Sequence, residues 1–193
     1  MSDWQPTASL EAIKARAELL STVRAFFAAR NVLEVDTPQL ARYGVSDPHI
    51  KCIPVPGYGY LQSSPEYHMK RLLAAGSGPI YQICKAYRHG EAGGRHNPEF
   101  TMLEWYRPGF ELNDLIQECL TLFADLFTDV RSQTYRFRDL FHDVTGLEPL
   151  TAEDPPLIAH AESCGAPKGL NKTAAVDYLM ATQVEAALPA EQL

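Results

Sequence analysis

The chain has 193 residues, of which 46% are apolar and 21% charged, and its formal net charge is −7. This composition is typical of a soluble globular protein, and the length suits one domain or a large piece of one. No apolar stretch is long enough for a membrane span, and the N-terminus lacks the basic start and apolar core of a signal peptide. The four scattered cysteines form no Cys-x-x-Cys pair, which favours reduced thiols in the cytoplasm and argues against a disulfide framework or a zinc ribbon.

The charge is unevenly distributed along the chain. Residues 1–110 carry a balance of +2, whereas residues 111–193 carry −9. Six of the lysines and arginines and three of the six histidines lie within 66–107, so an anionic ligand is best received there. Because no basic tract of the kind that neutralises many phosphates occurs, we expect a small anion rather than a nucleic acid.

The first predicted elements are a helix and a strand. Apolar residues recur at three- and four-residue steps between Ser9, which can begin a helix, and Asn31, which can end it. Residues 32–37 predict a strand that Pro38 stops. The Gly- and Pro-rich stretch 43–60 predicts loops and edge strands.

A second helix is predicted after a short strand at 60–63. Ser64 can cap this helix, Pro65 suits its first position, and Glu66 is favourable in its first turn. Gly76 can end it.

A hairpin is predicted next. Residues 80–89 and 100–107 have the composition of strands, and the loop 90–98 between them contains three glycines. Two strands joined by such a loop are expected to pair antiparallel.

The remainder of the chain predicts mainly helices. The strongest amphipathic pattern covers residues 112–127. Beyond it, a short strand is predicted near 134–138 and helices near 157–164 and 173–188. No chemistry can be assigned to residues 130–193.

The hairpin can gather polar side chains on one face, because alternate residues of a strand share a face. Arg88 shares a face with Ala86 and Cys84. Four residues of the return strand share a face: Phe100, Met102, Glu104 and Tyr106. A guanidinium can bind phosphate, an aromatic ring can stack on a base, and a carboxylate can bind an amine. The loop glycines would let backbone N–H groups approach a phosphate. The same pattern also fits an ordinary half-exposed hairpin.

The sequence of this region resembles a known family. Residues 80–107, with their His-Asn-Pro-Glu-Phe-Thr-Met-Leu-Glu run, resemble motif 2 of class II aminoacyl-tRNA synthetases of the lysyl branch. Residues 60–76 resemble the amino-acid-binding segment of that family, and residues 9–40 resemble motif 1 with Pro38 as its characteristic proline. The resemblance implies an α+β fold, in which helices flank the antiparallel sheet of a class II catalytic domain.

One branch of the family is the most similar. Residues 103–109 resemble the tRNA-independent elongation factor P–(R)-β-lysine ligases. These enzymes activate β-lysine with ATP and transfer it to a lysine side chain of elongation factor P. Only eight residues precede the motif 1 helix, which leaves no room for an anticodon-binding barrel, and the acidic balance suits an enzyme that does not hold tRNA.

The resemblance implies an ATP subsite on motif 2. Arg88 would contact the α-phosphate and stabilise charge in the transition state, and Phe100 would stack on the adenine. Asn97 would lie at the adenine edge and His96 near the outer phosphates. The other implied ATP-binding residues follow Arg88 directly: His89, Gly90 and Glu91. Many relatives have a glutamate where this chain has the glycine. A metal site in this loop is disfavoured, because the loop is too Gly-rich to fix tetrahedral ligands.

The resemblance also implies an amino-acid subsite. Glu66, which follows Ser64 and Pro65 in the substrate-binding set, would accept hydrogen bonds from the substrate amine. Glu104 and Tyr106 would complete the pocket for the lysine side chain.

Further expectations concern neighbouring residues and the assembly. Lys70 and Arg71 are expected on a solvated helix face, and Pro38 at the interface of a homodimer. Mg²⁺ would bridge the phosphates, with its protein ligands outside this chain, because neither motif 3 nor the acidic pair before it is found. Residues 1–193 are therefore interpreted as a catalytic domain that is incomplete at its C-terminus and weakly active or inactive alone.

Two alternatives remain open at this point. The chain could be a catalytic fragment of a lysyl-tRNA synthetase, or a non-catalytic module for dimerisation or regulation. The sequence also leaves open whether α- or β-lysine is the preferred substrate.

Overall fold

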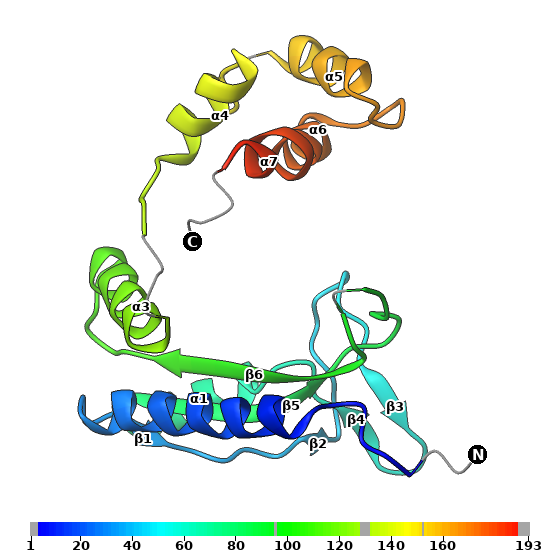
Figure 1. Ribbon diagram of the computed structural model, residues 1–193. Coiled ribbons are helices and arrows are strands. Elements are labelled where there is room, and N and C mark those ends of the chain that lie inside the picture. Colours follow the sequence, from blue (N-terminus) through cyan, green and yellow to red (C-terminus); the bar gives the residue numbers. More distant parts are fainter. Residues whose placement is uncertain (1–3, 95, 128–131, 152, 189–193) are drawn as a thin grey trace. The chain divides into compact units, whose positions relative to one another are not determined.

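The computed structural model describes residues 4–94, 96–127, 132–151 and 153–188. The chain divides into two compact units, Met1–Leu126 and Phe127–Leu193, and each is described by itself. Unit 1 contains α1 (Leu10–Ala28), β1 (Leu33–Glu34), β2 (Leu40–Ala41), β3 (Ile53–Val55), β4 (Gly59–Leu61), α2 (Glu66–Ala74), β5 (Ile80–Tyr87), β6 (Glu99–Tyr106) and α3 (Leu112–Leu126) (Figure 1).

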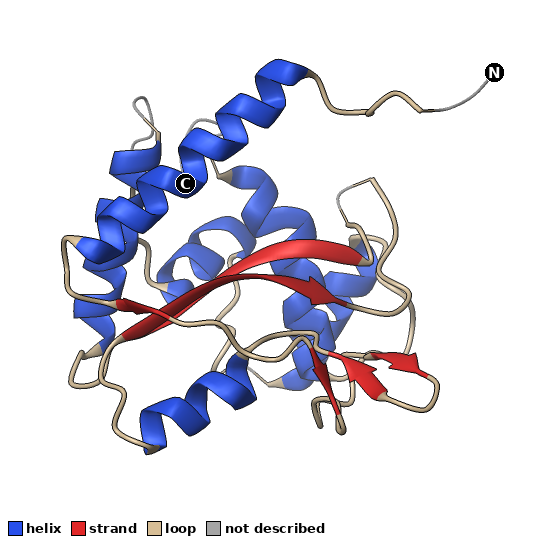
Figure 2. Cartoon of the chain, turned by 90° about the horizontal axis from the view of Figure 1, so that it is seen from below, coloured by secondary structure: helices blue, strands red, loops and turns tan. Residues whose placement is uncertain are grey.

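The strands of unit 1 form two small sheets, with the orders β1-β5-β6 and β2-β4-β3 (Figure 2). The predicted hairpin is confirmed: β5 and β6 pair antiparallel, and the register places Gln82 opposite Glu104 and Ala86 opposite Phe100. β1 instead runs parallel to β5, which requires a long connection between them, here the second sheet and α2. The amide of Tyr87 donates to the carbonyl of Gln62 at 3.0 Å and so links the end of β5 to the residue after β4.

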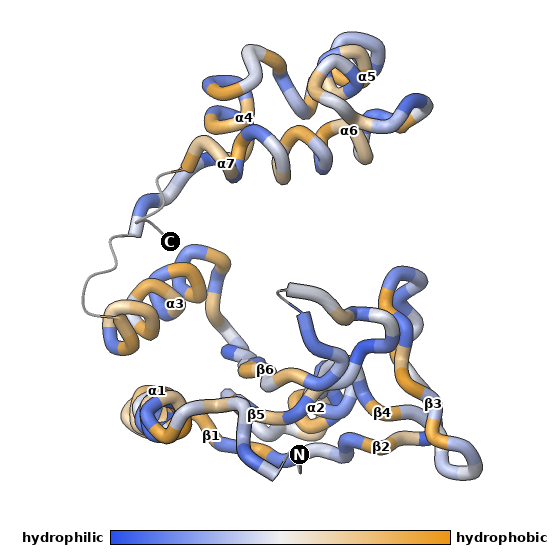
Figure 3. The backbone as a smooth tube through the Cα atoms, turned by 45° about the vertical axis from the view of Figure 1, so that its right-hand side comes forward, coloured by the Kyte–Doolittle hydropathy of each residue, from blue (hydrophilic) through white to orange (hydrophobic). Residues whose placement is uncertain are grey.

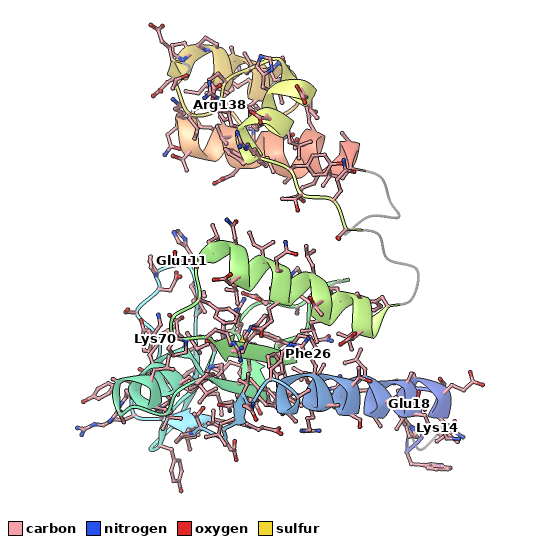
Figure 4. All side chains as sticks on the ribbon, turned by 90° about the vertical axis from the view of Figure 1, so that its left-hand side faces the viewer. Lys14, Glu18, Phe26, Lys70, Glu111 and Arg138 are labelled. Carbon is pink, nitrogen blue, oxygen red and sulfur yellow. The ribbon has the colours of Figure 1, made fainter. Side chains whose placement is uncertain are left out.

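The core of unit 1 lies on the face of the hairpin that α1 and α3 cover. Phe27 stacks on Tyr81 with ring centroids 4.4 Å apart, and the ring of Trp105 lies 5.6 Å from Phe27. Phe26, labelled in Figure 4, and Leu122 of α3 are buried in the same cluster. Each such side chain contributes about 1.5–3 kcal/mol when it leaves water. Apolar and polar segments alternate along both helices (Figure 3), as their sequence pattern predicts.

Local capping defines α1 as the sequence predicts. The Ser9 hydroxyl accepts a hydrogen bond from the amide of Ala12 at 3.1 Å. After the helix, Asn31 adopts a left-handed φ of 53°, a conformation that asparagine tolerates. The predicted strand at 32–37 is shorter than expected, because only Leu33 and Glu34 pair with β5.

The helix α2 begins one residue later than its sequence predicts, at Glu66 with Pro65 before it. The Ser64 hydroxyl nevertheless caps it, since it accepts a hydrogen bond from the Glu66 amide at 3.0 Å. Gly59 in the second sheet has φ 127°, and a Cβ there would lie 2.2 Å from the carbonyl oxygen of Ala41. Only glycine fits at that position.

Unit 2 is helical. Its elements are α4 (Phe137–Thr145), α5 (Asp154–Ser163), α6 (Lys172–Leu179), a π-helical turn (Met180–Val184) and α7 (Glu185–Ala187). The helices predicted near 157–164 and 173–188 are therefore confirmed. The strand predicted near 134–138 is wrong: residues 134–136 are irregular and α4 begins at Phe137, because apolar residues at helical spacing lead to the buried Phe141.

No described helix is both long and apolar enough to cross a membrane. All four cysteines are free thiols.

Candidate active site

The two faces of the β5–β6 hairpin carry different side chains. One face packs against α1 and α3, as described above. The other, here called the site face, carries alternate residues of both strands: Gln82, Cys84, Ala86, Arg88, Phe100, Met102, Glu104 and Tyr106. The structure confirms that this alternation brings Arg88 beside Phe100, with the guanidinium carbon 5.2 Å from the ring centroid.

A cavity of about 220 Å³ opens at the loop end of the site face. Among the described residues, five line it: Arg88, Glu91, His96, Asn97 and Phe100. All five belong to the predicted ATP-binding set. The hairpin loop therefore brings the members of that set together around one space.

Arg88 has unused hydrogen-bonding capacity in this cavity. Its Nη1 lies 3.7 Å from Glu91 Oε2, which is an ion pair but a long one. Its Nε is buried and has no hydrogen-bond partner among the described residues. A buried guanidinium donor without an acceptor is costly, so the site favours an anion there.

The remaining members of the predicted set lie beside the cavity rather than around it. The amide of His89 donates to the carbonyl of Lys51 at 2.8 Å, and Gly90 has φ 82°. The amide of Gly93 donates to the carbonyl of His96 at 3.0 Å. At least this loop amide is therefore already paired, in contrast to the expectation that the glycines free their N–H groups for a phosphate.

A second cluster lies toward the other end of the site face and is centred on the carboxylate of Glu104. Ser64 Oγ donates to Glu104 Oε2 at 2.7 Å, and the Tyr106 hydroxyl donates to Glu104 Oε1 at 2.6 Å. The same Ser64 oxygen caps α2 at Glu66, and the Glu66 carboxylate pairs with Lys70. One hydroxyl thus links the start of α2 to the predicted lysine pocket.

Burial shapes the chemistry of this cluster. Loss of solvent, reinforced by the hydrogen bond to Glu104, raises the pKa of Tyr106 far above its ordinary value, so it remains a phenol that donates. Burial and the charge of Glu104 raise the pKa of the Cys84 thiol to about 11. Cys84 is therefore a neutral thiol at physiological pH and a poor nucleophile.

Gln82 in this region was missed by sequence reasoning. Gln82 is 1% exposed, its Oε1 accepts from Thr37 Oγ1 at 2.9 Å, and its Nε2 has no partner among the described residues. Extending the alternation two residues before Cys84 would have found it. Lys70 is exposed as predicted, yet its ammonium contacts Glu66.

Two prolines of the predicted set lie in different environments. Pro65 is buried at the start of α2, whereas Pro38 is exposed and directly follows the buried Thr37. An exposed Pro38 is accessible to a partner.

The described residues do not form a site for Mg²⁺. Within the described ranges, no group of three or more His, Cys, Asp or Glu side chains could hold a metal ion. Glu91 is the one carboxylate that lines the cavity, and it is paired with Arg88. Magnesium prefers several oxygen ligands, so these residues alone do not fit the ion.

The chain is similar to known proteins. The family described as tRNA synthetases class II (D, K and N) matches residues 2–164. Proteins named elongation factor P–(R)-β-lysine ligase are similar to the chain: that of Pasteurella multocida (strain Pm70) is 45% identical over 169 residues, covering 83% of this chain and 52% of the relative.

Two further relatives carry the same name. That of Pseudoalteromonas translucida (strain TAC 125) is 49% identical over 158 residues, covering 77% of this chain and 49% of the relative. That of Histophilus somni (strain 2336) is 40% identical over 193 residues, covering 94% of this chain and 60% of the relative. The chain thus spans about half the length of the first of these curated relatives. The family match covers α1, the hairpin and its cavity, and the chain belongs to the class II tRNA synthetases of the D, K and N group.

Proposed function

We propose that this chain carries the ATP and amino-acid subsites of a ligase that activates a lysine-like amino acid, (R)-β-lysine, and attaches it to a lysine side chain of elongation factor P. The name of the similar proteins supports the reaction and the acceptor. The observation that carries the proposal is the site face of the hairpin. It presents a cationic, aromatic cavity at one end and a carboxylate cluster toward the other.

The cavity suits the nucleotide. Phe100 offers a stacking surface for adenine, an interaction worth about 1–3 kcal/mol for bound bases. Arg88, held beside that ring, is placed to bind the α-phosphate through a charge-assisted hydrogen bond. Asn97 and His96 line the same cavity and would supply polar contacts to the base edge and the outer phosphates.

The carboxylate cluster suits the amino acid. Glu104 and Glu66 are acceptors for ammonium groups, and Tyr106 and Ser64 hold Glu104 in a fixed orientation. A pre-organised carboxylate loses little side-chain entropy when a ligand binds. The arrangement therefore favours a ligand with two amines over a neutral amino acid.

The chemistry follows from these positions in two steps. An oxygen of the amino acid carboxylate attacks the α-phosphorus of ATP, pyrophosphate leaves, and Arg88 stabilises the charge on the phosphoryl oxygens. The amine of the acceptor lysine then attacks the carbonyl carbon of the adenylate, AMP leaves, and an amide forms. Mg²⁺ would neutralise phosphate charge when it binds with ATP.

We also propose a homodimer in which Pro38 lies at the interface. Support comes from its exposure and from the exposed apolar residues Leu10 and Ile13 on α1. Sedimentation velocity tests this proposal. A monomer at tens of micromolar protein would contradict it.

A variant pair tests the ATP site. Arg88→Ala should weaken ATP binding at least tenfold and abolish lysine-dependent pyrophosphate exchange in the full-length protein, because the main phosphate contact is lost. Arg71→Ala removes the same charge from an exposed position of α2 and should leave both unchanged. Equal ATP affinity for Arg88→Ala and wild type would show that the cavity is not the ATP site. Transfer of label to tRNA instead of elongation factor P would contradict the proposed acceptor.

A further inference from the structure

Lys70 places its ammonium group beside the carboxylate of Glu66, which the ammonium of the proposed substrate must reach. It lies one turn after Glu66 on α2 (Figure 4), and its Nζ contacts Glu66 Oε1 within hydrogen-bond distance. The side chains of Lys70 and Glu66 are 57% and 40% exposed, so water and small solutes reach the contact. The pair is therefore both formed and open to exchange.

Glu104, at the centre of the cluster, also affects the pKa of the Lys70 ammonium. The hydrogen bond and charge of Glu66, and further the charge of Glu104, raise the pKa of Lys70. Both oxygens of Glu104 already accept hydrogen bonds, from Ser64 and Tyr106. Lys70 is thus a cation that offsets part of the negative charge of Glu66 and Glu104.

This internal cation has the chemical form of the expected ligand. A lysine-like substrate carries a primary ammonium on a short methylene chain, as Lys70 does. Since the (i, i+4) geometry of a helix holds Lys70 near Glu66, the internal group binds without losing translational freedom. An exposed pair of this kind is weak, however, so a ligand that makes additional contacts can replace it.

We propose that Lys70 competes with the substrate ammonium for Glu66 and so sets the affinity and selectivity of the amino-acid subsite. The inference rests on the proposed function of that subsite. When the substrate binds, its ammonium takes the Glu66 oxygen and the Lys70 side chain turns to solvent. Ligands that bind through one amine alone gain too little to displace Lys70, whereas a diamino acid gains a second contact at Glu104.

The competition predicts that the affinity for the amino acid increases when the charge of Lys70 is removed. Lys70→Gln removes the charge and leaves a polar side chain that is one heavy atom shorter. Because exposed ion pairs are weak, the dissociation constant for lysine and (R)-β-lysine should fall by about two- to fivefold. ATP affinity should not change, since the hairpin cavity does not contain Lys70. Lys70→Arg keeps a cation, so its dissociation constant for the amino acid should be close to that of wild type.

Lys85 supplies a matched control on the same unit. Its side chain is 46% exposed and pairs with Glu99 at 2.8 Å, away from the cluster. Lys85→Gln changes the net charge by the same amount and should leave lysine binding at the wild-type value. This control separates local competition from the long-range effect of charge.

The experiment measures lysine and (R)-β-lysine binding by calorimetry, and the KM and kcat of pyrophosphate exchange, on full-length wild type and the three variants. The expected result is a lower Kd and KM for the amino acid in Lys70→Gln alone, with an unchanged unfolding midpoint. An equal or higher Kd in Lys70→Gln, in a wild type that binds lysine, would overturn the inference and leave the proposed function standing. A wild type that binds neither lysine nor ATP would overturn both.

Discussion

Thr37 Oγ1 donates a hydrogen bond of 2.9 Å to Gln82 Oε1, and the two side chains are 7% and 1% exposed. The bond joins the residue before Pro38 to the middle of β5, directly opposite Glu104 in the register. It therefore links the segment that follows β1 to the strand pair that carries the site. The residues of β1 and the amide of Val35, which donates to the carbonyl of Tyr81 at 2.9 Å, hold the start of this segment, and the side-chain bond extends the restraint to Thr37.

Thr37→Val tests that restraint. The substitution keeps the shape but leaves Gln82 without its donor, so the free energy of unfolding should fall by about 1–2 kcal/mol. Urea unfolding followed by tryptophan fluorescence reports on unit 1, since Trp4 and Trp105 both belong to it. Thr22→Val, at an exposed hydroxyl bonded within α1, should change stability by less than about 0.5 kcal/mol. Similar losses in both variants would contradict the role of the buried bond.

The aromatic ring of Phe100, and not only its volume, should contribute to nucleotide binding. Phe100→Leu removes the stacking surface and should weaken ATP binding about tenfold, measured by calorimetry. Phe110→Leu is the matched control, because Phe110 also lies under an arginine, Arg107, at 4.4 Å from its ring centroid, but outside the cavity. A Phe100→Leu protein with the affinity of wild type would place the adenine elsewhere.

Tyr106 should matter for the amino acid and not for ATP. Tyr106→Phe removes the donor to Glu104 Oε1, and a hydrogen bond to a charged group is worth enough to raise the KM for lysine about tenfold. The KM for ATP should stay constant in pyrophosphate exchange. Tyr87→Phe, which removes a hydroxyl bonded to Gln39, should behave as wild type. An equal rise in both KM values would indicate a structural effect instead.

Stability should decline in alkali in a way that depends on Tyr81. Burial and the hydrogen bond to Glu34 raise the pKa of Tyr81 to about 12, from about 10 when unfolded. The folded state thus favours the neutral phenol, so this contribution is complete below pH 10 and is lost as the pH rises toward 12. The free energy of unfolding should fall by roughly 2 kcal/mol from this group over that interval. Tyr81→Phe should flatten the decline in urea titrations, whereas Tyr58→Phe, at an exposed ring, should not.

The local parts of the fold could be predicted from the sequence. Ser9 and Asn31 delimit α1 because capping and left-handed turns depend on neighbouring residues alone. The hairpin follows from two strand-like runs around a Gly-rich loop. The parallel pairing of Leu33 with Ile80 could not be predicted, since it depends on how the chain between them folds. At α4, a local strand preference gave way to the burial of Phe141 in a helical core.

The candidate site likewise has contacts that the sequence predicts and contacts that it does not. Alternation along two paired strands was enough to predict that Arg88 and Phe100 lie together. The bond from Ser64 to Glu104 joins residues 40 positions apart, and no periodic pattern contains it. The sequence predicts a solvated face for Lys70, because charged residues at such helix positions are more often solvated than ligand-binding. Only the contact with Glu66, beside the cluster, distinguishes Lys70.

Leu103 and Trp105 of β6 pack against the core cluster, whereas Phe100, Met102, Glu104 and Tyr106 lie on the site face. A single inserted or deleted residue within this strand would exchange the two faces, turning Trp105 toward the site face and Glu104 toward Phe27. The register of the strand is thus a constraint in itself, independently of the identity of any one side chain. Length variation between homologues should consequently be confined to the loop at 90–98, where it leaves both faces in place.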